Sequence, residues 1–299
     1  MCVYVCVCRK GRSTIGHLST LTTSTETRKL RNASTSRAFI DFKKAYACVN
    51  RNLLFCNLDS LGLSSKIIKA LHSLYYNVQS FVEINGNYTE WFDVKSGLKQ
   101  DCILFSLLFN IFIINLVDEV KKLSVGVKLD NEKICVLLYA DDVVFLCENE
   151  SELQKCLDVL STWCNTNDLV VNLDKSKLVH FRTQSRISTD FQVSLNGNSL
   201  EAVSQYKYHG LLLADFLKYN DMAKAVAKSA SRSLGLLIAK CKANGGFEFS
   251  TFSKLFEALV MSVIEYGASI WGKKNVACIN SLKNRAMRFL WVLVNTPQI

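Results

Sequence analysis

Apolar residues in the first half of this chain fall into short runs that predict β-strands. Residues 38–42 form one run, and residues 134–147 form another that is interrupted by Tyr139-Ala140-Asp141-Asp142. Alternating residues at 81–94 flank Asn85-Gly86, a pair that is typical of a tight hairpin turn. We therefore expect a strand and two hairpins, with two adjacent Asp residues at the tip of one hairpin.

Other segments repeat apolar residues every three or four positions, which predicts helices. Ser64–Asn77 shows this spacing behind a Ser cap, and 102–122 is a longer and more apolar candidate. Ser151-x-x-Gln154 is a capping box that opens a helix with leucines on one face. Further strands are expected at 178–182, 192–195 and 206–213, and further helices at 221–241, 250–270 and 276–294.

This order of elements predicts an α+β protein in three parts. Residues 1–37 are rich in Ser, Thr, Arg and Lys, so we expect a basic, poorly ordered arm with at most a short helix near Glu26–Leu30. Residues 38–214 mix strands and helices, and residues 215–299 are helical.

Charge divides the chain in the same way. The 299 residues carry a net charge of +10 and are 49% hydrophobic, which suffices for a large core. Residues 1–40 hold seven Lys and Arg against one acid, residues 207–299 hold thirteen against five, and the middle is acidic. A polyanion lying across the basic flanks would suit this distribution, although Lys side chains also simply solvate helices.

The twelve cysteines have no regular spacing, so they predict neither a zinc site nor a disulfide framework. We expect a reducing, intracellular location, with nucleus and cytoplasm not distinguished. Apolar runs are too short to span a bilayer, so no membrane partner is expected. The one proline, Pro297, indicates that loops rely on Gly, Asn, Asp and Ser.

Candidate chemistry lies at Asp41, Asp141 and Asp142. Adjacent carboxylates repel each other at a turn that would normally use Gly or Asn, and a divalent cation would remove that cost. A second strand that delivers Asp41 to the same sheet edge makes a metal site plausible. A solvated Asp-Asp turn is the simpler alternative.

Five ordered blocks make the chain from Ala38 onward resemble the reverse transcriptases of non-long-terminal-repeat (LINE-type) retrotransposons. Two of them are Ala38-Phe39-Ile40-Asp41-Phe42-Lys43-Lys44-Ala45-Tyr46 and Leu137-Leu138-Tyr139-Ala140-Asp141-Asp142. The resemblance implies that Asp41, Asp141, Asp142 and the Phe42 carbonyl hold two Mg²⁺ ions. It also implies that Tyr46 packs under the incoming sugar and excludes ribose; a plain core aromatic is the alternative.

The block from Gly97 to Asn110 resembles the family's segment beside nucleotide and template, and Gln100 keeps its expected place there. The block departs from the family at four positions, which are Asp101, Ile103, Phe105 and Ser106. Asp101 replaces a Gly, so it adds bulk and a negative charge where a backbone should approach the template.

The last two blocks are Asn172–Lys177 and Tyr206–Leu211. By resemblance Lys175 lies near the triphosphate and would protonate the leaving pyrophosphate, or else it is a surface lysine. Tyr208 and Gly210 belong to a hairpin that grips the primer strand. His209 replaces the usual Leu between them, as a structural substitution and not as a base.

The resemblance implies a polymerase palm, an antiparallel sheet packed on helices, with truncated fingers and a helical thumb or connection subdomain. It implies an RNA-directed DNA polymerase that takes an RNA template, a DNA primer and deoxynucleoside triphosphates. Two alternatives stay open, an inactive remnant that binds nucleic acid through its basic flanks and a scaffold protein related to intron maturases.

Overall fold

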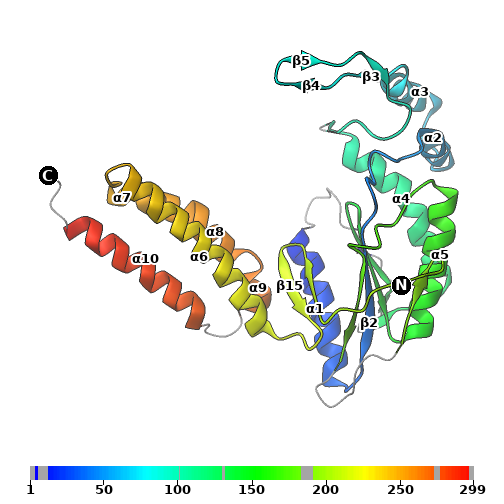
Figure 1. Ribbon diagram of the computed structural model, residues 1–299. Coiled ribbons are helices and arrows are strands. Elements are labelled where there is room, and N and C mark those ends of the chain that lie inside the picture. Colours follow the sequence, from blue (N-terminus) through cyan, green and yellow to red (C-terminus); the bar gives the residue numbers. More distant parts are fainter. Residues whose placement is uncertain are drawn as a thin grey trace.

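A computed structural model describes residues 4–5, 13–100, 102–129, 132–182, 191–272 and 277–295. A central sheet carries helices on both faces, with a hairpin arm extending from one end and a group of helices beside it (Figure 1). Strand and helix content is mixed along the chain, so the predicted α+β class is confirmed.

Five strands form the central sheet in the order β1-β9-β10-β2-β11. Their bounds are Tyr4–Val5 (β1), Val136–Tyr139 (β9), Asp142–Cys147 (β10), Thr35–Ile40 (β2) and Lys177–Phe181 (β11). Only the β1 and β9 pair is parallel among these described strands. β2 lies second from one edge, so segments distant in sequence flank the strand that leads into Asp41.

Alternate side chains of the sheet enter two separate cores. Ala38 and Ile40 of β2 face a core built with α2, α4 and α5, whereas Phe39 between them faces the opposite core. The bounds of these helices are Arg51–Ser60 (α2), Phe105–Lys122 (α4) and Glu150–Thr166 (α5). The apolar run at 38–40 is buried on both faces, as a central strand requires.

Helix α1 (Thr14–Leu30) covers the second face of the sheet. Leu18 and Leu21 are fully buried there, together with polar Thr22 and Thr25. The prediction of a poorly ordered arm is therefore wrong for residues 14–30. The helix is much longer than the short one expected near Glu26–Leu30.

Helix α3 and the hairpin arm lie away from the central sheet (Figure 1). Helix α3 (Ser65–Tyr75) matches the predicted helix, and the Asn85-Gly86 turn joins β4 and β5 as predicted. The arm's strands are Gln79–Ser80 (β3), Glu83–Ile84 (β4), Asn87–Tyr88 (β5) and Phe92–Asp93 (β6). Smaller hairpins are formed by Val127–Leu129 (β7) with Glu132–Ile134 (β8) and by Ser194–Leu195 (β12) with Asn198–Ser199 (β13).

Residues 206–213 form a hairpin and not one strand, because Gln205–Tyr208 (β14) turns at His209-Gly210 into Leu211–Ala214 (β15). Beyond it the predicted helices are present as α6 (Tyr219–Ala243) and α10 (Ala277–Asn295). The helix expected over 250–270 is broken at Gly267, whose φ is 66°, and it contains a π-helical turn. Its pieces are Phe249–Phe256 (α7), Glu257–Met261 (η1), Ser262–Glu265 (α8) and Ala268–Trp271 (α9).

The capping box was assigned to the wrong residue. Helix α5 begins after Asn149, whose side chain accepts a hydrogen bond from the Glu152 amide at 2.9 Å. Ser151 lies inside the first turn.

Within the described residues, none of the helices has the length and apolarity needed to cross a bilayer. The domain boundaries at 38 and 215 stay predictions.

Candidate active site

Two strands deliver the candidate carboxylates to one edge of the central sheet. Asp41 follows the end of β2 directly, and Asp142 opens β10. Val143 pairs with Ile40 in the antiparallel register, which sets Asp142 across from Asp41. Asp141 occupies the two-residue turn that joins β9 to β10. We call these three residues the carboxylate edge.

The turn itself is strained. Ala140 has a φ of 55°, in the left-handed region that L-residues with a Cβ seldom adopt. Pairing of Tyr139 with Asp142 on either side closes the hairpin around this residue. Sheet pairing therefore compensates for an unfavourable backbone, as is common where a turn must present functional groups.

Neighbouring polar groups fix Asp41 from both its backbone and its side chain. Its amide donates to Ser176 Oγ at 3.0 Å, and Asn172 Nδ2 donates to Asp41 Oδ2 at 3.2 Å. Lys175 Nζ lies 3.8 Å from the same carboxylate oxygen, although its side chain is 69% exposed. The predicted closeness of Lys175 to the site is present, while its role toward a triphosphate stays a prediction.

Burial and the neighbouring negative charges raise the pKa values of Asp141 and Asp142. Burial raises the pKa of Asp142 to about 6, helped by the nearby charges of Asp141 and Asp41. The pKa of Asp141 is also raised, first by burial and then by Asp41, while Lys175 opposes the shift in both. Such coupling requires the three side chains to be close.

This donor set fits a divalent cation. Oxygen ligands suit Mg²⁺, and positive charge beside Asp141 and Asp142 would offset the burial and repulsion that raise the pKa values of these two residues. Within the described ranges, however, no three His, Cys, Asp or Glu side chains are already arranged to hold an ion. The ligand roles of Asp41, Asp141 and Asp142 stay predictions, as does that of the Phe42 carbonyl.

Tyr46 lies beside the carboxylate edge. Its ring stacks on Phe105 at a centroid distance of 4.3 Å and tilts against Phe109 at 4.5 Å. Its hydroxyl donates to Asp141 Oδ1 over a long 3.5 Å. The ring packing and the hydroxyl contact fit a gate and a plain core aromatic equally, so the gate role stays a prediction.

Two other predicted nucleotide-binding residues behave differently. The Phe42 side chain is buried 6.4 Å from the Trp163 ring, and its backbone forms a bridge with Val171. Gln100 is exposed in the turn that precedes position 101. Asp101, the most disruptive departure in its block, lies outside the described residues.

Two histidines, His209 and His17, lie close to the carboxylate edge, and the sequence predicted no role in the site for either. His209 Nδ1 lies 3.7 Å from Asp142 Oδ2, and its side chain is only 7% exposed. Its ring lies edge-on to Tyr139 at 4.7 Å and also contacts Tyr208 at 3.9 Å. Fully buried His17 of α1 places Nδ1 3.4 Å from the Tyr208 hydroxyl. The spacing of His17 gives no signal of this contact.

The predicted primer-grip residues lie at the turn of the β14–β15 hairpin. Tyr208 is buried against Phe39 and Gly210 has a φ of 82°. A Cβ at Gly210 would come within 3.4 Å of the Tyr266 ring, so a side chain there would crowd the helices beyond. The primer-grip role itself stays a prediction.

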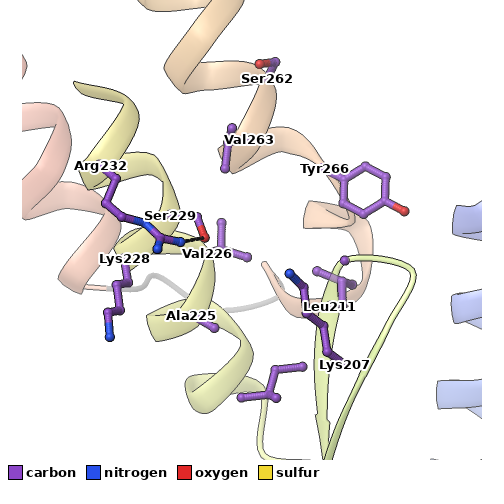
Figure 2. Close-up of a pocket in the computed structure, with 12 residues that line it drawn as sticks. Lys207, Leu211, Ala225, Val226, Lys228, Ser229, Arg232, Ser262, Val263 and Tyr266 are labelled. Atoms are coloured by element: carbon purple, nitrogen blue, oxygen red, sulfur yellow. Dashed lines mark hydrogen bonds between the residues drawn. The ribbon is translucent and has the colours of Figure 1, made fainter. Parts of the chain in front are cut away.

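Next to this turn, a cavity of about 560 Å³ opens between the hairpin and helices α6 and α8. Its lining includes three cationic side chains, Lys207 on β14 and Lys228 with Arg232 on α6 (Figure 2). Arg232 donates to Ser229 Oγ at 3.3 Å. None of the three carboxylates lines this cavity, so the cavity is separate from the carboxylate edge.

Comparison with known proteins decides the family. Residues 5–213 match the family described as reverse transcriptase (RNA-dependent DNA polymerase). The chain belongs to the reverse transcriptase family. The match begins ahead of α1, which agrees with the packing of that helix on the sheet.

Relatives come from mobile elements of the non-long-terminal-repeat class, as the sequence blocks predicted. The chain is 27% identical to the probable RNA-directed DNA polymerase from transposon BS of Drosophila melanogaster, over 94% of this chain and 31% of that protein. It is 22% identical to the polymerase from mobile element jockey of the same species, over 70% and 24%. The chain thus spans about a third or less of these relatives.

Solved structures resemble the fold at low sequence identity. Telomerase from Candida tropicalis, in complex with a TWJ fragment of telomeric RNA, aligns with a TM-score of 0.51 and 15% identity. That alignment covers 96% of this chain and 46% of the telomerase chain. Truncated apo telomerase from the same species gives 0.50 and 17%, over 68% and 39%. The likeness supports the polymerase architecture and says nothing of activity.

Proposed function

We propose that this chain carries out RNA-directed DNA synthesis at the carboxylate edge, with two Mg²⁺ ions. The observation that carries the proposal is the meeting of Asp41 with Asp141 and Asp142, which lie one hundred residues apart in sequence. The raised pKa values of Asp141 and Asp142 indicate a site that favours added positive charge. Substrates would be an RNA template, a DNA primer and deoxynucleoside triphosphates.

Each carboxylate would have a defined task. Asp41 and Asp141 would hold both ions, with Asp142 beside them. Bound magnesium makes the primer 3′-hydroxyl more acidic and neutralises the triphosphate. The Asp41 backbone is fixed by Ser176 and its carboxylate by Asn172, so it would keep its position as ligands arrive. Lys175, whose Nζ lies 3.8 Å from the Asp41 carboxylate, would donate a proton to the departing pyrophosphate.

Nucleic acid would lie across the basic surface beyond the β14–β15 hairpin. Lys207, Lys228 and Arg232 line the cavity there, within a segment that carries thirteen basic and five acidic residues. Cations on one helix face and one hairpin can neutralise successive phosphates of a strand. In this proposal the central sheet and its helices are the palm, the hairpin arm with β3–β6 belongs to the fingers, and α6–α10 form the thumb.

A second function is an inactive remnant that binds nucleic acid without synthesis. It is favoured by the absence of a preformed metal cluster in the described part of the chain. The acidic residue at position 101 supports the same alternative, because a carboxylate repels a polyanionic template.

The test is primer extension on an RNA template with Mg²⁺, comparing the parent chain with Asp141→Asn. Removing one carboxylate should lower the rate by about a hundredfold or more, as loss of a charge-stabilising group does in other enzymes. Asp118→Asn is the matched control, since Asp118 is an exposed carboxylate on α4 paired with Lys121. Template binding without extension by the parent would establish the remnant instead.

A further inference from the structure

Arg51, the first residue of α2, binds the backbone of a distant segment with nearly its whole guanidinium. Its Nε donates to the Gly97 carbonyl at 2.8 Å, Nη1 to Val94 at 2.7 Å and Nη2 to Ser96 at 3.0 Å. The guanidinium also lies 5.1 Å from the centre of the Tyr75 ring. Among the residues that the structure describes, no carboxylate forms a salt bridge with Arg51, so the interaction is with carbonyl dipoles and an aromatic face.

The segment that Arg51 holds, residues 96–98, lies directly on the loop after Asp41. Gly97 donates its amide to the Val49 carbonyl at 2.9 Å, and Leu98 donates to Tyr46 at 2.9 Å. Ser96 Oγ adds a bond of 3.2 Å to the Ala47 carbonyl. We call residues 96–98 the strap, because it closes over the backbone of the loop that carries Tyr46.

Glycine is required at the centre of the strap. Gly97 has a φ of 82°, and a Cβ there would lie 2.6 Å from the Ala47 carbonyl oxygen. Two backbones therefore approach each other without any side chain between them. A contact this close transmits a displacement of the strap directly to residues 46–49.

We propose that Arg51 is a positioning residue for nucleotide selection, and that it acts through the strap on Tyr46. The path runs from the guanidinium to the Gly97 and Ser96 carbonyls, then through the Leu98 amide to the Tyr46 backbone. It ends at the Tyr46 ring, which stacks on Phe105 and reaches Asp141. This inference rests on the proposed function, because it assigns Arg51 to the same site.

Only an arginine can make this set of contacts. Its planar fork presents donors in three directions at once, whereas a lysine ammonium is a compact point charge. Burial lowers the pKa of Arg51 below its ordinary value, but a guanidinium stays protonated at neutral pH. Arg51→Lys thus keeps the charge and the aliphatic stem while it loses the simultaneous hold on three carbonyls.

The experiment compares the parent chain with Arg51→Lys. Arg182→Lys is the matched control, since Arg182 is also partly buried, pairs with Asp215 at 2.9 Å and lies over the Phe216 ring, away from the strap. Hydrogen exchange of the Gly97 and Leu98 amides reports the strap. The ratio of deoxynucleotide to ribonucleotide incorporation on one template reports the position of Tyr46.

We expect faster exchange at Gly97 and Leu98 and a roughly tenfold fall in selectivity in Arg51→Lys, since small misplacements of a positioning group cost about this much or more. Arg182→Lys should change neither. If Arg51→Lys does not fold, Ser96→Ala removes one strap bond, and a smaller change in the same direction is expected. Unchanged exchange, or faster exchange with unchanged selectivity, overturns the positioning role.

Failure of the proposed function can be distinguished from failure of the role proposed for Arg51. If the parent extends no primer, selectivity is taken from equilibrium binding of a deoxynucleotide and its ribonucleotide to the complex with template and primer. A parent that binds the deoxynucleotide selectively without extension overturns only the proposed function, and Arg51→Lys must then reduce that selectivity. A parent that binds neither nucleotide overturns both proposals.

Discussion

His209 and Asp142 face each other across 3.7 Å at neutral pH without forming an ion pair. Burial lowers the pKa of His209 to about 4, so the imidazole is neutral where the carboxylate is charged. The same lack of solvent raises the pKa of Asp142 to about 6. The two shifts have opposite signs because burial penalises a cation and an anion alike.

The first prediction concerns acid stability and His209→Leu. The folded pKa of about 4 lies below the ordinary value of 6.5, so the unfolded chain binds more protons between these limits. The parent should lose stability as the pH falls from about 6.5 to 4, by up to about 3 kcal/mol. Urea titrations at pH 7 and pH 4.5 should show that loss reduced in His209→Leu. His72→Gln, on an exposed histidine, should leave the acid loss unchanged.

Asp142→Asn should have the opposite pH dependence over nearly the same pH range. The folded pKa of Asp142 is raised from 3.8 to about 6, so the fold loses stability as the pH rises between these values and carries the full cost above about 6. We expect the amide to stabilise the metal-free chain at pH 7 by about 1 kcal/mol, a figure reduced because the side chain is 41% exposed. At pH 4 the gain should vanish. A gain of equal size at both values would contradict the electrostatic cause.

Magnesium should stabilise the parent chain. An ion that binds the folded state at ten times its Kd adds about 1.4 kcal/mol, or roughly 3 °C in Tm for a chain of this size. Differential scanning fluorimetry with MgCl2, against NaCl of equal ionic strength, measures the shift. Asp141→Asn should remove most of it. A shift that persists in Asp141→Asn would place the ion elsewhere.

How far the sequence predicts this fold depends on the segment. The Asp41 and Asp141–Asp142 positions were predictable, because each carboxylate ends or begins an apolar run that must be a buried strand. Helix α1 was not, because Ser and Thr fill its buried face. Thr22 and Thr25 donate to the carbonyls of Leu18 and Leu21 at 2.8 Å, so their hydroxyls are satisfied within the helix when they are buried. Such residues read as polar in the sequence.

The sequence predicted the carboxylates of the candidate site, but it did not predict the contacts of the residues that hold the site in place. Asn172 was part of a recognised block, but its bond to Asp41 depends on where the chain returns beside β2. Arg51 gave no signal at all, since its partners are backbone carbonyls at least twenty-four residues away. Contacts with backbone atoms leave no residue pattern that a single sequence can show.

Arg37 of β2 gives a prediction about the buried interface with α1. It is fully buried, donates to the Leu21 carbonyl at 2.7 Å and to Ser24 Oγ at 2.9 Å, and burial lowers its pKa to about 9. Arg37→Ala should cost about 3 kcal/mol, because it removes these bonds and leaves a cavity.

Arg37→Met is the informative companion variant. It fills most of the space and removes the buried charge, so its cost should be well below that of Arg37→Ala. Equilibrium urea unfolding measures both. Equal losses in the two variants would show that the hydrogen bonds, and not the packing, hold α1 on the sheet.

The Phe39 ring stacks on Tyr206 at 4.5 Å and contacts Tyr208 at 5.2 Å, so it supports the β14–β15 hairpin from beneath. Phe39 also belongs to β2, the strand that ends at Ile40 and leads directly into Asp41. A load applied to the hairpin by a moving strand would therefore reach the carboxylate edge through one aromatic side chain. A substitution of Phe39 would therefore disturb the hairpin and the carboxylate edge together, and neither could be altered alone from this position.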